Sequence, residues 1–237
     1  MFFAVFLFPP AYAADTCVDC HKDVKFRVLN KKLFDYYNNW NDSVHDLADV
    51  KCINCHGGNP TVADKDASHK DHFSSFKADG KDSYKVVPDK CGKCHKEVLK
   101  NFIESKHYKA LIEKKTGPNC VTCHGSMSTE IYNISNIAKG CALCHNEETK
   151  NIPEAGSKAE NFLQSINISR AYKKWATIYY SGSQPKLVED INAQYKDIVF
   201  SWHSFNFERI DEKSMKLLNE LKALVNKKLA EKRKQKK

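Results

Sequence analysis

The chain contains ten cysteines, and all of them belong to one repeated pattern in which two cysteines separated by two residues are followed directly by a histidine. Two thiols at this spacing lie on one side of a helical turn, where each can reach one of the two vinyl groups of a haem. The adjacent histidine then comes under the iron as an axial ligand. The pattern is the attachment signature of c-type haem. Its five copies are Cys17, Cys20 and His21; Cys52, Cys55 and His56; Cys91, Cys94 and His95; Cys120, Cys123 and His124; and Cys141, Cys144 and His145.

Paired cysteines also occur in zinc ribbons, redox-active dithiols and disulfide scaffolds. A zinc ribbon gives no reason for a histidine directly after every pair, and a disulfide scaffold would not repeat one spacing five times. Because no cysteine lies outside a complete motif, the sequence predicts five covalently attached haems c.

Five further histidines match the number of predicted irons. Methionine cannot supply the sixth ligand to most of the five irons, since only Met127 and Met215 lie beyond the N-terminal segment. We therefore expect mostly bis-histidine ligation and low redox potentials. The candidate distal ligands are His45, His69, His72, His107 and His203.

Two of these candidates occur in a repeated context. His45 and His107 each follow a serine by two residues and precede a haem motif that is closed by glycine. The repeat predicts that both are ligands. His107 lies twelve residues after His95, about 18 Å away if one helix joins them, so it should serve a different haem from His95.

The other three candidates leave alternatives open. His203 is the only histidine of the C-terminal part, and as a ligand it would dock that part onto the haem core. The alternative is a buried, hydrogen-bonded histidine beside aromatic residues. His69 and His72 are three residues apart. At least one of them is predicted to be a ligand, and for one of them solvent exposure is the alternative.

Residues 1–13 have the pattern of a signal peptide. The apolar run Met1–Phe8 is broken by two prolines and followed by Ala11-Tyr12-Ala13, a small-x-small cleavage site. The run is shorter than the ~20 apolar residues of a membrane span, so cleavage is expected rather than a membrane anchor. Because no positive residue precedes the run, the true N-terminus is expected upstream. The mature protein is then periplasmic or extracellular, without a transmembrane span.

The rest of the chain divides into two zones. Residues 14–150 hold all haem motifs and form the predicted pentahaem domain, and residues 151–237 form a predicted helical segment that packs on the haem core. We expect a mainly α fold that the haems organise, with little regular structure in its core and a C-terminal helical hairpin. In the hairpin, apolar residues recur every three or four positions, and Pro185 opens the second helix. The haems replace a side-chain core, so the haem-free chain should not fold.

The formal charge of +9 falls to roughly +4 when each ferric haem with two propionates contributes about −1. The most basic segment is the C-terminal end, residues 227–237. It is either a solvated helix end or a docking patch for an acidic redox partner or an anionic surface. Nucleic-acid binding is not expected.

At these residues the chain resembles the superfamily of multihaem cytochromes c that includes hydroxylamine oxidoreductase, its tetrahaem partner, the octahaem reductases and pentahaem nitrite reductase. The resemblance implies stacked haem pairs, a mainly α fold and extracytoplasmic respiratory electron transfer. All five motifs here end in histidine, whereas the nitrite reductases carry a lysine at the catalytic haem and are much longer. The residues that carry the resemblance are Ser43 and His45 before Cys52, Cys55, His56 and Gly57; Ser105 and His107 before Cys120, Cys123, His124 and Gly125; and His203 with Asn206.

Two functions are consistent with these features. The first is electron transfer through the five haems, with redox proteins as partners: a quinol-oxidising cytochrome, a terminal reductase or another multihaem cytochrome. The second is a small reductase of nitrogen or sulfur oxyanions, which needs one five-coordinate iron. Assembly into a homo-oligomer, through a shared histidine or a coiled coil, is a further alternative.

Overall fold

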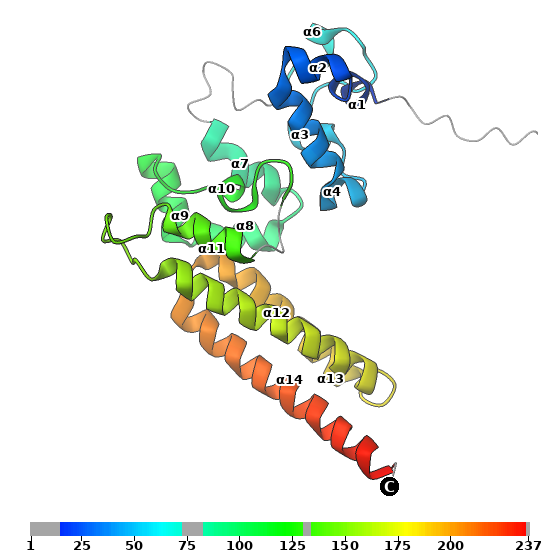
Figure 1. Cartoon of the computed structure of the whole chain (residues 1–237), viewed down its shortest axis with the longest axis vertical. Helices are drawn as coiled ribbons and strands as arrows, with labels where there is room; N and C mark the ends of the chain where they lie inside the picture. The colour runs from blue at the N-terminus through cyan, green and yellow to red at the C-terminus, as the bar shows by residue number, and fades with distance from the viewer. Residues whose placement is uncertain (1–14, 73–82, 130–133, 236–237) are drawn as a thin grey trace, which may run out of the picture. The chain divides into compact units, whose positions relative to one another are not determined.

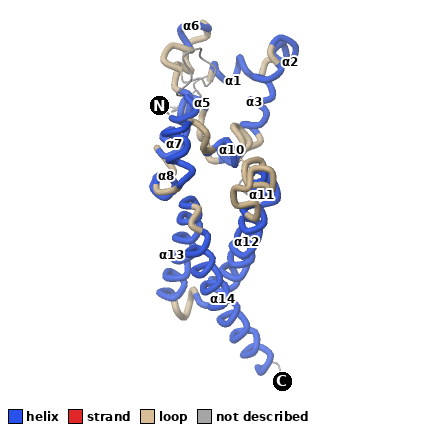
Figure 2. The backbone as a smooth tube through the Cα atoms, turned by 90° about the vertical axis from the view of Figure 1, so that its left-hand side faces the viewer, coloured by secondary structure: helices blue, strands red, loops and turns tan. Residues whose placement is uncertain are grey.

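A computed structural model of the chain describes residues 15–72, 83–129 and 134–235, and within these ranges it contains helices and loops but no strand (Figures 1 and 2). The predicted mainly α class is confirmed. The predicted signal peptide lies outside the described residues. In the described ranges, no helix combines the length and the apolar character that crossing a membrane requires. The chain forms two compact units, Met1–Tyr84 with Ser126–Thr129, and Lys85–Gly125 with Glu130–Lys237.

The first unit carries two haem motifs on short helices. Polar side chains cap these helices and so stop them from fraying: Asp15 accepts hydrogen bonds from the backbone N–H groups of Cys17 and Val18, and Asp64 accepts one from Ala67. The helices are α1 (Thr16–His21), α2 (Val24–Leu29), α3 (Lys31–Asn41), α4 (Val44–Leu47), α5 (Cys52–His56) and α6 (Lys65–Ser68).

This unit has almost no interior of its own. Among residues 15–72, the single fully buried residue is Ser43. Large apolar side chains instead lie at the surface, including Val28 at 86 % and Leu47 at 84 % exposure. A unit of this size without a hydrophobic core needs another source of stability. That haems take the place of core side chains in this unit remains a prediction.

The second unit carries the other three motifs and the C-terminal helices. Its motif-bearing part is again made of short helical segments. The C-terminal part consists of three long helices rather than the two of a hairpin. The elements are α7 (Ser83–Gly92), which begins at the boundary between the units, α8 (Lys96–Ile103), α9 (Lys106–Lys109), the π-helical turn η1 (Ala110–Lys114), α10 (Cys120–His124), α11 (Ile134–Ala142), α12 (Ala155–Tyr180), α13 (Pro185–Ser201), the 3₁₀ turn η2 (Trp202–Ser204) and α14 (Phe207–Gln235).

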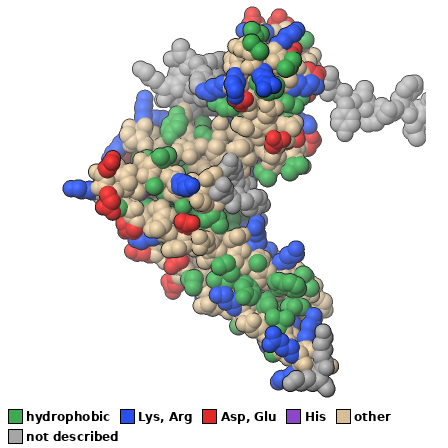
Figure 3. All heavy atoms as spheres, viewed as in Figure 1, with side chains coloured by type: hydrophobic (Ala, Val, Ile, Leu, Met, Phe, Trp, Pro, Cys, Tyr) green, Lys and Arg blue, Asp and Glu red, His purple; other side chains and the backbone are tan. Residues whose placement is uncertain are grey.

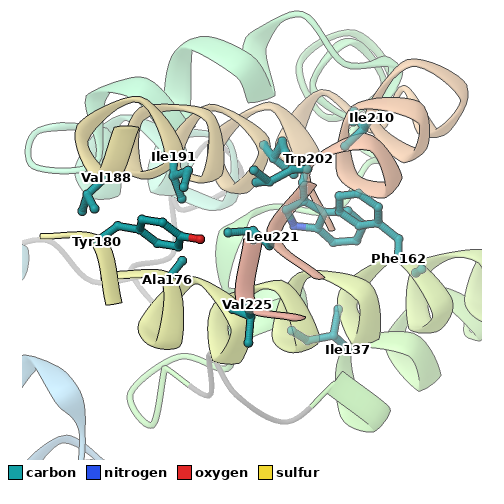
Figure 4. Packing of buried hydrophobic residues seen from close by; sticks show 13 residues of the cluster. Ile137, Phe162, Ala176, Tyr180, Val188, Ile191, Trp202, Ile210, Leu221 and Val225 are labelled. Atoms are coloured by element: carbon teal, nitrogen blue, oxygen red, sulfur yellow. The ribbon is translucent and has the colours of Figure 1, made fainter. Parts of the chain in front are cut away.

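Helices α12, α13 and α14 lie side by side and enclose a hydrophobic core (Figures 2 and 4). Phe162 of α12 stacks on Trp202 with ring centroids 5.5 Å apart, and Leu221 of α14 is completely buried. The Tyr180 hydroxyl donates a hydrogen bond to the carbonyl of Leu224 at 3.0 Å. As predicted, Pro185 stands at the first position of α13. The buried cluster comprises Ile137, Ala159, Phe162, Ala176, Tyr180, Val188, Ile191, Ile198, Trp202, Ile210, Leu217, Leu221 and Val225.

This core joins the C-terminal helices to one of the haem motifs. Ile137 of α11 belongs to the buried cluster, and Cys141, four residues later, packs against it. The C-terminal helices and the three motifs therefore share one unit. The domain boundaries expected from the sequence, 14–150 and 151–237, remain a prediction.

Candidate haem-binding sites

Three of the five motifs form a helix by themselves, namely α1, α5 and α10. Motifs three and five begin in the last residues of α7 and α11. Helical backbone places the two thiols of motifs one, two and four on one side of a turn, whereas Cys94 and Cys144 lie in the turns that follow α7 and α11. Gly57 and Gly125 follow α5 and α10 with φ of +73° and +74° and extended ψ, a conformation nearly restricted to glycine. The chain therefore turns directly after each of these two motifs.

The thiols of different motifs lie near one another within each unit. Cys91 of motif three and Cys120 of motif four share a hydrogen bond, which raises the pKa of Cys120. Burial raises the pKa of Cys123 to about 11, and the nearby Cys141 of motif five adds to it. In the first unit, burial raises the pKa of Cys52 to about 11. The hydrogen bond from Cys120 lowers the pKa of its partner Cys91, so the pKa values of the motif thiols shift in both directions.

Motif five lies close to a candidate distal histidine from another helix. The Nε2 atoms of His107 and His145 are 3.5 Å apart, although 38 residues separate them in sequence. A metal–imidazole bond is about 2 Å long, so two nitrogens on opposite sides of one iron lie about 4 Å apart. The short helix α9 positions His107, and it is not continuous with α8, which follows His95. The geometry thus brings His107 to motif five.

Motif four faces the C-terminal helices. The ring centroids of His124 and His203 are 6.2 Å apart, with an interplanar angle of 31°. His203 lies in η2, between α13 and α14. Burial first, and then the neighbouring His124, lower the pKa of His203 to about 4. Its imidazole is therefore neutral at physiological pH, which is the form that binds a metal.

In the first unit, both uncertain histidines lie near motif histidines, with His69 exposed and His72 partly buried. The ring centroid of His69 is 6.2 Å from that of His21. His72 stacks on His56 with centroids 5.2 Å apart and an interplanar angle of 11°. Burial lowers the pKa of His21, and the neighbouring His69 and His56 lower it further. The structure brings the first two motif histidines and both candidate distal histidines into one group.

Backbone carbonyls orient three of these imidazoles. The Nδ1–H of His69 donates to the carbonyl of Lys65 at 2.6 Å, and that of His145 donates to Asn151 at 2.7 Å. His203 makes the same bond to Phe200 at 3.3 Å. A hydrogen bond at Nδ1 leaves the Nε2 lone pair for a metal and fixes the ring plane. In all three residues, Nε2 is therefore the candidate metal-binding atom.

The repeated serine has a structural role next to the candidate ligands. Ser43 is the N-cap of α4, and its Oγ accepts a hydrogen bond from the backbone N–H of His45 at 3.2 Å. Ser105 caps α9 in the same way and accepts from Tyr108 at 3.0 Å. Both serines are buried. A capped single turn therefore presents each histidine, which explains the Ser-x-His pattern. His45 remains a predicted ligand.

Phe205 is a contributor that sequence reasoning did not single out. Its ring packs edge-on against His107 with centroids 4.3 Å apart. Phe205 has φ of +55°, which turns the chain between η2 and α14. The segment that places His203 near His124 of motif four thus also contacts His107 near motif five. The aromatic residues around His203 were the only sequence signal of this role.

The residues present fit a haem at these positions. Neighbouring imidazoles, with a hydrogen bond at Nδ1 of His69, His145 and His203, would suit an iron held by two histidines. The thiols of motif residues such as Cys20, Cys94 and Cys144 are exposed, and none of the ten cysteines is in a disulfide. Within the described ranges, no group of three or more histidine, cysteine or carboxylate side chains is arranged to hold a metal ion alone.

A search of curated proteins finds the chain similar to the multihaem cytochrome MtrA of Shewanella baltica (strain OS185). The two sequences are 27 % identical over 132 residues, which is 56 % of this chain and 32 % of that protein. The matched segment thus spans about a third of the relative. No protein-family model matches the chain, and the search of solved structures found no match. The similarity supports the prediction that the chain is a multihaem c-type cytochrome.

Proposed function

We propose that this protein is an exported electron carrier with five covalently attached haems c, mostly ligated by two histidines each. The observation that carries the proposal is the approach of His107 Nε2 to within 3.5 Å of His145 Nε2. Three other pairs of histidine rings support the same proposal. They are His124 with His203, His21 with His69, and His56 with His72. The similarity to a multihaem cytochrome supports the same class of function.

Haem c would supply a one-electron Fe(III)/Fe(II) couple at each site. The chain contributes the spacing between sites. The hydrogen bond between Cys91 and Cys120 brings attachment points of motifs three and four together, and Cys123 lies close to Cys141 of motif five. In the first unit, Cys17 lies close enough to Cys52 to raise its pKa. Neighbouring attachment points favour short steps for electron hopping within each unit.

The redox partners in this proposal are other proteins: a quinol-oxidising cytochrome, a terminal reductase or another multihaem cytochrome. The site of action is the periplasm or the cell exterior, where c-type haem is attached. The alternative, a reductase of nitrogen or sulfur oxyanions, needs one open iron. The placement of His69 opposite His21 and of His72 opposite His56 supports two six-coordinate irons and therefore favours the carrier.

Two measurements on the exported protein test this proposal. Intact-mass spectrometry should show the polypeptide with the added mass of five haems. Electron paramagnetic resonance of the oxidised protein should show low-spin ferric signals only. An unmodified polypeptide mass would end the haem assignment, and a stoichiometric high-spin signal would favour the reductase.

A further inference from the structure

Helix α12 has an exposed apolar surface in addition to its buried one. The side chains of Ile168, Trp175 and Ile178 are 46 %, 51 % and 58 % exposed, and Ala171 between them is exposed as well. Their spacing of three and four residues places them along one side of the helix. Trp175 lies on this exposed side of the helix, whereas the nearby Ala176 and Tyr180 are buried. We call these four residues, together with the groove between α12 and α14 that adjoins them, the aromatic face.

A shallow groove between α12 and α14 continues this surface. It is lined by aromatic and aliphatic side chains, and Lys232 of α14 lies over the Tyr179 ring at 4.5 Å. Figure 3 shows hydrophobic side chains gathered over this part of the C-terminal helices, with lysine and arginine around them. The lining residues are Ala171, Tyr172, Trp175, Tyr179, Val225, Asn226 and Leu229.

The charges around the aromatic face are almost all positive. Residues 161–180 of α12 contain Arg170, Lys173 and Lys174 but no acidic residue. Residues 221–235 of α14 contain six lysines and arginines and one acidic residue, Glu231, which is paired with Lys228 at 2.8 Å. An apolar strip with aromatic rings and a cationic border is the surface that binds at the interface of an anionic bilayer.

Two other occupants fit these observations less well. A second copy of the chain would place one basic surface against another, and like charges repel. A redox protein docked here would be far from the attachment sites. Gly156 packs against Ala138 and Ala142, beside motif five, and Trp175 lies nineteen residues further along α12, about 28 Å away. Electron tunnelling is slow over such a distance, so a membrane contact fits better than a redox contact.

We propose that the aromatic face binds the surface of anionic phospholipid membranes and holds the haem-bearing part of its unit away from the bilayer. Trp175, Ile168 and Ile178 insert among the headgroups and upper acyl chains. Lys174, Lys232 and their neighbours contact lipid phosphates. This function is additional to electron transfer and concerns where the carrier resides.

Co-sedimentation of the holoprotein with vesicles tests the proposal. Vesicles of equal parts phosphatidylglycerol and phosphatidylcholine should bind the protein, and vesicles of phosphatidylcholine alone should bind it much more weakly. The double variant Trp175→Ala/Ile178→Ser should lower the affinity for the anionic vesicles about tenfold, because binding strength scales with inserted apolar area. The double variant Lys174→Gln/Lys232→Gln should weaken binding and reduce its dependence on salt.

Matched variants control for general effects of substitution. Val28→Ser removes an exposed apolar side chain from the first unit, and Lys216→Gln removes an exposed charge from the middle of α14. Neither should change vesicle binding. Haem absorbance and circular dichroism establish that every variant is folded.

Several results would overturn the proposal. Two are absence of binding to anionic vesicles and unchanged binding by Trp175→Ala/Ile178→Ser. A third is binding to soluble polyglutamate that is equally strong and does not depend on Trp175, which would mark the aromatic face as a site for acidic proteins. A lipid-free dimer in light scattering that the same double variant dissociates would identify a second copy as the occupant. Because none of these outcomes depends on the haem count, they are distinguishable from failure of the proposed electron transfer.

Discussion

Backbone carbonyls accept hydrogen bonds from Nδ1 of His69, His145 and His203 and leave Nε2 of each ring as the candidate metal-binding atom. This preparation matters most for His203, since burial and His124 also keep it neutral by lowering its pKa to about 4. A residue that is buried, neutral and directed at another histidine has the properties of an axial ligand. The predictions at the scale of single residues therefore concern the distal histidines.

We expect His203→Ala to convert one haem from low-spin to high-spin. The substitution removes the nitrogen opposite His124 and leaves an open position at that iron. Electron paramagnetic resonance of the oxidised variant measures the change. As a matched variant, His203→Met should keep the iron six-coordinate and raise its potential, because methionine ligation stabilises Fe(II). An unchanged spectrum in His203→Ala would exclude His203 as a ligand.

Separate His69→Ala and His72→Ala variants should each produce one high-spin haem. Each histidine lies opposite a different motif histidine, at 6.2 Å from His21 and 5.2 Å from His56 between ring centroids. The double variant should show two high-spin haems in the same measurement. If one single variant retains an entirely low-spin spectrum, that histidine is not a ligand, and the open-iron alternative regains support.

At the scale of secondary-structure elements, the three long helices differ from the short ones in the source of their stability. The short helices carry motifs and candidate ligands and depend on caps such as Ser43, Ser105 and Asn119. Helices α12, α13 and α14 share a hydrophobic core, and a buried hydrogen bond of 2.7 Å joins Ser165 to Ser214 within it. Substitutions in this core should therefore act on stability and leave the haem spectrum of the folded protein unchanged.

We expect Leu221→Ala to lower the free energy of unfolding of the holoprotein by about 2–5 kcal/mol, because it removes apolar burial and leaves a cavity. Leu221 is completely buried among the three helices (Figure 4). Denaturant unfolding followed by far-UV circular dichroism measures the change. The control is Met215→Ala, also on α14 but 42 % exposed, which should cost less than about 1 kcal/mol. Equal losses in both variants would contradict the packing described here.

At the scale of the whole molecule, the two units have unequal side-chain cores. In residues 15–72 the single buried side chain is Ser43, whereas the second unit contains the cluster of thirteen buried hydrophobic residues. The sequence alone suggested that no part of the haem-free chain would fold. The core around Phe162 and Leu221 changes this expectation for the C-terminal helices, because apolar burial there does not require haem.

Hydrogen exchange of the haem-free chain should therefore be uneven. Amides of residues 15–72 should exchange as in an unfolded chain, and amides of α12 and α14 should keep measurable protection. In the holoprotein both regions should be protected. Mass spectrometry of peptides after exchange measures this. Retained protection throughout residues 15–72 without haem would show that the first unit folds unaided and would remove the argument for haem as its core.

The sequence by itself predicted the attachment chemistry, because a Cys-x-x-Cys-His motif acts within one helical turn and needs no distant residue. It also determined the helical class and features as local as Pro185 at the start of α13 and the glycines after α5 and α10. Only the tertiary structure decided which histidines face each other, since His107 and His145, or His124 and His203, are joined by long segments whose path depends on packing. For the same reason the periodicity of α12 could not show that Trp175 lies on the outside, because apolar residues occur on two sides of that helix and only the positions of α13 and α14 select the buried one.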